Sequence, residues 1–475
     1  MDLTAEQKNI VASQDKILLV NAYAGTGKTS TLVEYCRARV GSKILYLAYN
    51  ASMAKEALKK FRGLEVDSTT IHALAYRHIG KDFQERLGDN LSLKPIDLIR
   101  YFPQDYESAN ALLAVFKSFL FSKETINAVM EQNKELDKNI LKYLPILWKD
   151  IQCDSSLPFE HDFYLKMYQL SSPVLDYDYI LVDEAQDLNP MMLDIVIKQK
   201  ARLVFIGDTF QKIYGFRECI NALESLASYE GARTLYLTET FRCPQNIIAL
   251  ANPYLALLRA EKPLVSKKIV PKEELRKKQA QCIICRTNAK VLEFVSDNLD
   301  KKIHFIGGVK GYGFDDLIDL MLVLSKNPEL KRNIKNPFYK KAFVDSESLM
   351  GYIKESKDSE IRGKLILLFK LLKDEINPFE LIKNIKDSPK KDADFIITSA
   401  HKSKGLEWEH VLLYDDFFDV ADSLEKEEKL VDAEELNLLY VAITRAKESL
   451  EMVKDYSISW ELFQKAQQNL VITKT

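Results

Sequence analysis

The sequence contains no long apolar run and few cysteines. No hydrophobic stretch approaches the ~18 residues that a membrane-spanning helix needs, and the first residues, MDLTAEQKN, lack the basic and then apolar layout of a signal peptide. These absences predict a cytoplasmic protein with no membrane partner. The six cysteines are too sparse for a disulfide framework. Cys282 and Cys285 have C-x-x-C spacing but stand in an apolar run without a second ligand pair, which favours core thiols on a strand over zinc ligands.

The chain also lacks an excess of charge of either sign. Its 67 basic and 69 acidic residues give a formal net charge of -2, so any nucleic-acid surface has to come from local clusters. The basic segments 262–278 and 331–341 could either contact phosphates or form ordinary solvated faces, and the acidic stretch 415–435 is interpreted as a solvated loop or helix face. A content of 47% hydrophobic and 29% charged residues excludes a disordered chain.

Short apolar runs of strand type alternate with helical patterns along the chain. Near-continuous apolar strands favour parallel sheets covered on both faces, and 475 residues suffice for about three or four compact units. The stretches 81–170 and 309–390 interrupt the alternation with helical patterns, which predicts two mainly helical insertions. The predicted strands are 16–22, 43–49, 178–184, 202–207, 281–286, 303–307, 394–399, 410–414 and 449–453.

The segment after the first predicted strand matches a phosphate-binding loop except at one position. Residues 22–29 are AYAGTGKT, so they follow G-x-x-x-x-G-K-[ST] with Ala22 in place of the first glycine. The two glycines let backbone N–H groups turn toward phosphates, Lys28 neutralises β- and γ-oxygens, and Thr29 offers a hydroxyl to Mg²⁺. A chance glycine-rich turn rarely combines a strand, G-K-T and a helix. The candidate ATP-binding residues here are Ala22, Gly25, Thr26, Gly27, Lys28, Thr29 and Ser30.

An acidic pair follows the predicted strand 178–184. An open α/β sheet binds ligands at the carboxyl ends of its strands, so Asp183 is a candidate Mg²⁺ ligand and Glu184 a candidate for polarising the attacking water. Such a pair alone is often a surface turn. Its combination with a phosphate loop favours nucleotide hydrolysis.

The remaining motifs form an ordered series along nearly the whole chain. The series resembles the UvrD/Rep-like branch of superfamily 1 DNA helicases, and AYAGTGKTSTL followed by LAYN is most similar to the F-box DNA helicase group, although no F-box is evident. The motifs, besides the phosphate loop, are LTAEQ (3–7), LAYNASMAKEA (47–57), TTIHALAY (69–76), VDEAQD (182–187), GDTFQKIYGFR (207–217), LTETFR (237–242), CRTN (285–288), TSAHKSKGLEW (398–408) and ELNLLYVAITRAK (435–447).

The resemblance implies an α/β fold with two RecA-like P-loop motor domains, each with parallel sheets and a mainly helical insertion. Residues 1–80 and 171–240 are then the two parts of the first motor domain, with 81–170 inserted. Residues 241–308 and 391–475 are the two parts of the second, with a short insertion at 309–390. ATP is expected between the two motor domains.

The resemblance also implies roles around the nucleotide. Gln7 contacts the adenine edge, Phe241 stacks on the adenine ring, and Glu407 contacts the ribose. Gln211 senses the γ-phosphate and positions water. The arginine fingers are Arg242 and Arg445, and a guanidinium supplied by a second domain would stabilise the charge that develops in phosphoryl transfer.

A second set of residues matches the family's DNA contacts. Aromatic faces suit sequence-independent binding of single strands, because every base has a π-surface. Tyr49, Tyr214 and Phe216 match base-stacking positions, and His72, Arg217 and His401 match positions near the DNA. Each is also of a residue type that is more often structural when it stands alone.

These resemblances predict an ATP- and Mg²⁺-dependent DNA helicase or translocase that moves 3′ to 5′ on single-stranded DNA, separates strands at single/double-strand junctions and functions as a monomer. Its expected setting is bacterial or phage-like cytoplasm, with association with the nucleoid when on DNA. Two alternatives remain. A P-loop kinase or GTPase-like switch leaves the second sheet unexplained. A DNA-binding scaffold that ATP merely locks would have lost its catalytic groups, whereas this chain retains them.

Overall fold

The computed structural model describes residues 2–88, 92–103, 105–215, 219–268, 282–327, 329–356, 359–427 and 429–473. Its first sheet has six parallel strands in the order β3-β2-β4-β5-β1-β6. The strands are β1 (Ile17–Ala22), β2 (Ile44–Ala48), β3 (Val66–Thr70), β4 (Tyr179–Val182), β5 (Arg202–Gly207) and β6 (Ala232–Leu237). The inner strands β1, β2, β4 and β5 are almost fully buried, as their apolar runs predict.

The second sheet has five parallel strands in the order β10-β11-β9-β12-β14. They are β9 (Cys282–Cys285), β10 (Ile303–Phe305), β11 (Phe395–Ser399), β12 (Trp408–Leu413) and β14 (Ala446–Met452). Two small parallel pairs accompany it, β7 (Glu239–Pro244) with β8 (Val265–Lys268) and β13 (Leu430–Asp432) with β15 (Val471–Thr473). Cys282 and Cys285 are both buried on β9, as the apolar run around them predicts.

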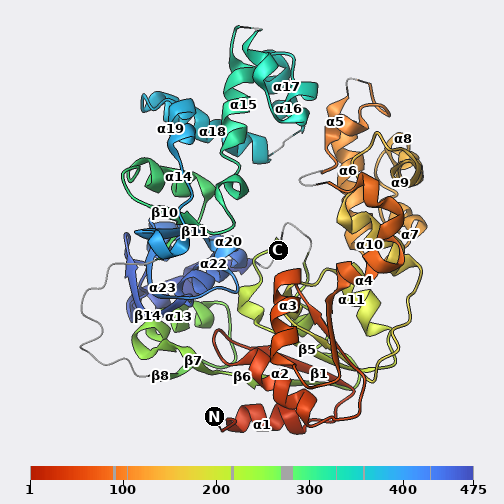
Figure 1. Ribbon diagram of the computed structural model, residues 1–475, viewed down its shortest axis with the longest axis vertical. Coiled ribbons are helices and arrows are strands. Elements are labelled where there is room, and N and C mark those ends of the chain that lie inside the picture. Colours follow the sequence, from red (N-terminus) through yellow and green to blue (C-terminus); the bar gives the residue numbers. More distant parts are fainter. Residues whose placement is uncertain are drawn as a thin grey trace.

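Helices cover both sheets and also fill the two stretches where strands are missing (Figure 1). Around the first sheet lie α1 (Ala5–Ala12), α2 (Lys28–Arg37), α3 (Ala51–Lys60), α11 (Pro190–Ile197) and α12 (Ala222–Ser225). Around the second lie α13 (Gln245–Leu257), α14 (Asn288–Ser296), α20 (Ala400–Ser403), α21 (Val420–Glu425), α22 (Ala433–Ile443) and α23 (Trp460–Asn469). No described helix is long and apolar enough to cross a membrane.

Two helical groups stand above the sheets in Figure 1. Between β3 and β4 come α4 (Ile71–His78), α5 (Pro95–Leu98), α6 (Tyr106–Phe121), α7 (Ile126–Gln132), α8 (Lys138–Leu141), α9 (Tyr143–Cys153) and α10 (His161–Leu170). Between β10 and β11 come α15 (Asp315–Leu324), α16 (Pro337–Ala342), α17 (Ser346–Ser356), α18 (Ser359–Lys373) and α19 (Pro378–Asn384). The two groups touch through the edge-to-face rings of Tyr106 and Tyr352, whose centroids are 5.5 Å apart.

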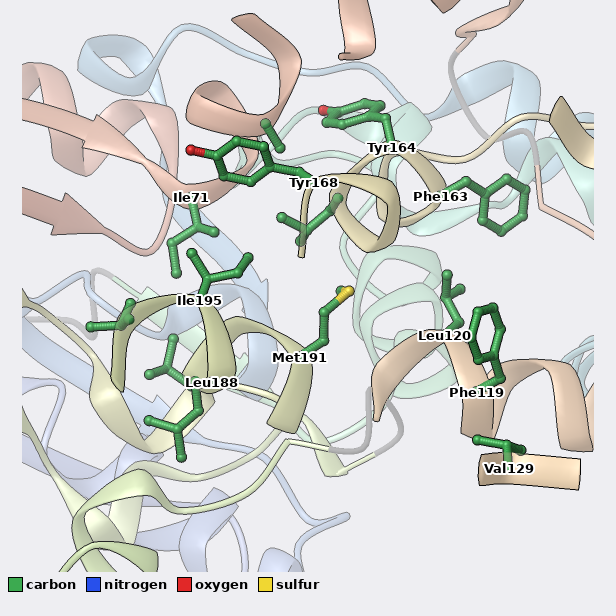
Figure 2. Packing of buried hydrophobic residues seen from close by; sticks show 14 of the residues in the cluster. Ile71, Phe119, Leu120, Val129, Phe163, Tyr164, Tyr168, Leu188, Met191 and Ile195 are labelled. Atoms are coloured by element: carbon green, nitrogen blue, oxygen red, sulfur yellow. The ribbon is translucent and has the colours of Figure 1, made fainter. Parts of the chain in front are cut away.

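The core of each sheet continues into its helical group. On the first sheet, one cluster runs from the strands through Ile71, Leu188 and Met191 to Phe119 and Phe163 of the helical group (Figure 2). A second cluster joins the other sheet to α15, α17 and α18. A third cluster crosses between the sheets, because it joins residues of the phosphate loop to α13 and α22. The insertions therefore share a hydrophobic core with the sheet from which they emerge.

The α/β class and all nine predicted strands are confirmed, within a few residues at their ends. In the two main sheets the sequence prediction missed β3 and β6, and it also missed the strands of the small pairs, β7, β8, β13 and β15. β3 and β6 are edge strands of the first sheet, and their residues are mostly half-buried or exposed. A strand with one neighbour and partial burial needs no continuous apolar run, so VDSTT and ARTLYL carry only a weak strand signal.

Candidate functional site

The phosphate loop connects β1 to α2 with two residues in the left-handed region. Gly25 has φ +71° and Gly27 has φ +82°, a conformation that glycine adopts without the steric cost of a Cβ. Space also requires glycine at position 25, because a Cβ there would lie 2.4 Å from Arg242 Cβ. Lys28 begins α2 directly after Gly27. The loop therefore directs the N-terminal end of a helix and one lysine toward the same space.

The acidic pair lies at the end of β4, next to the lysine of the loop. Lys28 Nζ is 2.8 Å from Glu184 Oε1, and the Tyr46 hydroxyl donates to Asp183. Glu184 has φ +51°, a strained backbone for a residue with a side chain and one often found at functional sites. Gln186 Nε2 donates to Glu184 Oε2 at 2.6 Å. Both oxygens of the Glu184 carboxylate are thus oriented by neighbours.

The charged groups of this pocket shift one another's pKa. Burial alone would raise the pKa of Glu184, but Lys28 and Lys404 outweigh it and lower that pKa to about 2. Burial also acts to lower the pKa of Lys28, yet Glu184 and Asp183 leave it raised. The pKa of Asp183 is raised, by burial and then by the adjacent Glu184. Glu184 is therefore an anion at neutral pH, as a residue that polarises water must be.

The segment after β5 carries Gln211 into the same pocket. Asp208 is fully buried and accepts a hydrogen bond from Gln211 Nε2 at 2.7 Å. Asp208 N–H donates to Gln186 Oε1 at 3.1 Å, which links this segment to the Glu184 carboxylate. Burial raises the pKa of Asp208, opposed by Lys28 and by its hydrogen bonds. Gln211 is thus connected to Glu184 through Asp208 and Gln186.

The second half of the chain contributes two arginines to this pocket, Arg242 on β7 and Arg445 between α22 and β14. Arg445 is 1% exposed and its Nη2 donates to Gln211 Oε1 at 3.3 Å. Burial, followed by Arg242, lowers the pKa of Arg445 to about 10, so it stays a cation. Arg242 Nε donates to Glu407 Oε2 at 2.6 Å, and its Cβ lies against Gly25. The structure brings both predicted arginine fingers and the predicted ribose contact to the phosphate loop.

The predicted adenine contacts, Gln7 and Phe241, also border the loop. Gln7 is buried on α1, where its Oε1 accepts from Thr4 N–H at 3.0 Å. Its Nε2 would be 3.1 Å from a Cβ at Gly27, so it borders the loop directly. Phe241 N–H donates to Gly25 O at 2.9 Å. A nucleotide in the loop would therefore lie near both.

A lysine from the second sheet also crosses the interface. Lys404 follows α20, forms a buried ion pair with Asp187, and donates to Gln211 O at 2.6 Å. Its Nζ lies 4.9 Å from the ring centre of Tyr214. Burial raises the pKa of Asp187 to about 6, and Lys404 opposes that rise. This cation ties the Gln211 segment to the second sheet.

Three of the predicted DNA contacts form one aromatic group. The rings of Tyr49 and Tyr214 are stacked, with centroids 5.6 Å apart and planes 11° apart. His401 lies 6.2 Å from Tyr214, and burial followed by Arg286 lowers the pKa of His401 to about 4. His72 instead contacts Asp162, at 3.0 Å, and Tyr164. Phe216 and Arg217 lie outside the described residues.

Comparison with known proteins agrees with this geometry. An AAA domain model matches residues 7–217, and a model of the UvrD-like helicase C-terminal domain matches residues 341–456. The F-box DNA helicase 1 of Gallus gallus is 28% identical over 95% of this chain, and the F-box DNA helicase protein 1 of Schizosaccharomyces pombe is 29% identical over 94%. The chain is thus similar to UvrD-like DNA helicases along most of its length.

Relatives also include a bacterial UvrD-like helicase. The ATP-dependent DNA helicase PcrA of Staphylococcus epidermidis is 24% identical over 68% of this chain. The chain spans 49% of the Gallus gallus protein, 57% of the Schizosaccharomyces pombe protein and 53% of this PcrA. It thus covers about half the length of these UvrD-like relatives.

The residues of this pocket fit ATP with Mg²⁺. The two left-handed glycines, the helix end and Lys28 match a triphosphate, and Thr29 and Asp183 have the oxygen ligands that Mg²⁺ prefers. In the described part of the chain, no group of three or more His, Cys, Asp or Glu side chains is arranged to hold a metal ion. Mg²⁺ commonly binds one or two carboxylates plus substrate phosphates, so this pocket meets its needs.

Sequence reasoning gave no role to four side chains of this pocket. Asp208, Lys404 and Tyr440 lie within the motifs given above, whereas Tyr46 lies on the predicted strand 43–49, directly before LAYNASMAKEA. The Tyr440 hydroxyl donates to Asp208 Oδ2 at 3.1 Å and accepts from Ala24 N–H at 3.1 Å. In the sequence, Lys404 is the second lysine of HKSKGLEW and Tyr440 is the tyrosine of LLYVAITR, so both motifs pointed to these two residues.

Proposed function

We propose that this chain is an ATP-dependent DNA helicase or translocase that moves 3′ to 5′ on single-stranded DNA and separates strands at single/double-strand junctions. The observation that carries the proposal is the hydrogen bond from Arg445 Nη2 to Gln211 Oε1. It joins a cation of the second sheet to the first sheet's γ-phosphate sensor, beside Glu184 and Lys28. Hydrolysis in such a pocket requires both sheets, and this requirement links chemistry to relative movement of the two halves.

The residues of the pocket divide the work of phosphoryl transfer. Lys28 and the loop N–H groups hold the phosphates, while Thr29 and Asp183 would hold Mg²⁺, which would neutralise phosphate charge. The Glu184 carboxylate accepts the proton of the attacking water, and Gln211 orients that water. Arg242 and Arg445 stabilise the charge that develops on the transferred group. Lys28 then exchanges its contact with Glu184 for a contact with phosphate, which leaves the carboxylate available to water.

The aromatic group suits a single strand of bases. A base between Tyr49 and Tyr214 needs roughly 7 Å between the rings, twice a normal contact distance, whereas their centroids are 5.6 Å apart. Binding therefore widens this pair. Tyr214 is three residues from Gln211, so a movement of the Tyr214 ring is transmitted to the Gln211 side chain through a short segment. This proximity supports coupling between DNA and hydrolysis.

The names of the relatives support DNA as the substrate, since the proteins of Gallus gallus, Schizosaccharomyces pombe and Staphylococcus epidermidis are all called DNA helicases. Both alternatives are weaker. A kinase or GTPase-like switch leaves Arg242, Lys404 and Arg445 without a reason to converge on the pocket. A scaffold locked by ATP has no use for a Glu184 anion with both oxygens oriented. We also propose that one chain suffices, because all the groups named here come from a single chain.

The test measures ATP hydrolysis with Mg²⁺, with and without single-stranded DNA, and then unwinding of duplexes with 3′ or 5′ single-stranded tails. We expect strong stimulation by the single strand and unwinding from the 3′ tail, which would place the enzyme on the tailed strand moving toward the junction. Hydrolysis without any response to DNA contradicts the helicase proposal. Unwinding only from a 5′ tail overturns the polarity and leaves the motor intact.

A further inference from the structure

The hydroxyl of Tyr440 joins three parts of the pocket that are far apart in the sequence. Tyr440 belongs to α22 and is fully buried. Its oxygen accepts from the phosphate-loop N–H of Ala24 and donates to Asp208 Oδ2, both at 3.1 Å. The same Asp208 oxygen accepts from Gln211 Nε2 at 2.7 Å. One phenol of the second sheet therefore reaches both the phosphate loop and the anchor of the water-positioning glutamine.

The orientation of the Gln211 amide depends on this chain of hydrogen bonds. Its Nε2 faces the Asp208 carboxylate and its Oε1 faces the Arg445 guanidinium, at 2.7 and 3.3 Å. A carboxylate accepts and a guanidinium donates, so each end of the amide has one suitable partner. Asp208 is buried, and burial raises its pKa. The Tyr440 hydroxyl supplies a donor that stabilises its charged form.

Neighbouring contacts make α22 the partner of the whole segment from Asp208 to Gly215. Asn437 Nδ2 donates to Lys212 O at 2.9 Å, and Glu434 Oε2 accepts from Gly215 N–H at 3.1 Å. Glu434, Asn437 and Tyr440 are spaced by three residues, so they lie along one side of the helix. Only Tyr440 among them also contacts the phosphate loop in the described contacts.

Resting on the helicase function proposed above, we infer that Tyr440 is a positioning residue for hydrolysis that acts through Asp208 to orient Gln211. It touches neither water nor phosphate itself. When the two sheets approach, its hydroxyl reaches Ala24 and Asp208 together, and the Gln211 amide turns toward the attacking water. When the sheets separate, the hydroxyl withdraws from Asp208 and Arg445 withdraws from Gln211 Oε1, so the amide keeps only its bond to Asp208. Hydrolysis is then limited to the closed arrangement.

The test is a double-mutant cycle on steady-state ATP hydrolysis with saturating oligo-dT. Tyr440→Phe keeps the ring and removes the hydroxyl, and we expect kcat to fall roughly tenfold, as for one lost hydrogen bond to a charged group. The KM for ATP should change less than about twofold, because Tyr440 does not touch the nucleotide. In a Gln211→Ala background the same substitution should lower kcat by less than about twofold. A role through packing alone would lower kcat equally in both backgrounds.

The matched control is Tyr254→Phe. Tyr254 is also a buried tyrosine of the second sheet's helices, on α13, and its hydroxyl donates to the Tyr456 carbonyl away from the pocket. This variant should retain wild-type kcat and KM. If Tyr440→Phe does not fold, Asp208→Asn takes its place in the same cycle. We expect Asp208→Asn to lower kcat in the wild-type background and to lower it much less in the Gln211→Ala background.

Two failures are distinguishable. If the unsubstituted chain hydrolyses no ATP, the proposed function is wrong and the inference fails with it. If the chain hydrolyses ATP but the Tyr440 and Gln211 effects multiply, or if Tyr440→Phe raises KM without lowering kcat, only the positioning role is wrong.

Discussion

The two parallel sheets face each other across the pocket with opposite charges. The first sheet presents carboxylates at the ends of β4 and β5, in Asp183, Glu184 and Asp208, with Lys28 as its one cation at the center. The second presents Arg445 and Lys404, with side chains largely buried. Each set of buried charges is costly alone and is stabilised by the other. The sheets are therefore alike in architecture but complementary in charge, and neither half alone holds both the carboxylates and Arg445 with Lys404.

The sharpest way to break this division is to remove the second sheet's cation. We expect Arg445→Ala to lower ATP hydrolysis roughly a thousandfold, because an arginine finger stabilises the transition state far more than the bound nucleotide. Nucleotide affinity, measured by equilibrium titration with a non-hydrolysable analogue, should change much less. Arg233→Ala, an exposed arginine on β6 paired with Asp15, is the control for losing an arginine. Equal losses of hydrolysis and affinity would mean that Arg445 binds ground-state nucleotide.

Glu184→Gln tests the first sheet's side of the comparison. The amide has nearly the same shape but cannot take a proton, so hydrolysis should fall roughly a hundredfold or more while ATP and DNA still bind. The measurement is single-turnover hydrolysis together with DNA affinity. Because Lys28 and Lys404 hold the pKa of Glu184 near 2, wild-type activity between pH 6 and 8 should not follow titration of this carboxylate. Undiminished turnover by Glu184→Gln would remove it from the water-activating role.

Sequence reasoning was most successful where burial alone determines residue type. The inner strands of both sheets are covered on two faces, and their apolar runs identify them without reference to any neighbour. The edge strands β3 and β6 were missed because partial exposure relaxes that requirement. The phosphate loop was predicted because its backbone geometry demands glycines at fixed spacing, and Gly25 and Gly27 have the expected left-handed conformation.

Contacts between the sheets were harder to predict. Every residue of α22 from Leu436 to Ile443 is buried, and a helix buried on all sides has no polar face to reveal its orientation. The sequence therefore could not show that Tyr440 points at Asp208 and Ala24. Lys404 resembles a solvated lysine until tertiary structure places Asp187 beside it. Pairings between segments about 200 residues apart depend on packing that no local pattern encodes.

A substitution in the aromatic group of Tyr49, Tyr214 and His401 should have a smaller effect, on the affinity for DNA. Tyr214→Ala removes one face of the Tyr49–Tyr214 stack, and single-strand affinity should fall roughly tenfold, within the range for one lost base stack. Fluorescence anisotropy with labelled oligo-dT measures this, and affinity for ATP without DNA should stay close to wild type. Tyr229→Ala, an exposed tyrosine following α12, is the control. Unchanged DNA binding by Tyr214→Ala would remove this aromatic group from the DNA path.

The smallest expected effect separates burial from charge at His401. Burial, followed by Arg286, lowers its pKa to about 4 in the folded protein, against 6.5 when exposed. The unfolded chain therefore binds more protons between pH 6.5 and 4, so the stability contributed by neutral His401 is complete above pH 6.5 and is lost as the pH falls. From pH 7.5 to 6 this loss is about 0.8 kcal/mol. The measurement is urea unfolding of wild type and His401→Gln at pH 7.5 and pH 6. Between these pH values the free energy of unfolding of His401→Gln should change by less than that of wild type, and the difference should equal this amount. Parallel changes in the two proteins would mean that folding does not lower the pKa of His401, so that burial does not hold this imidazole neutral below pH 6.5.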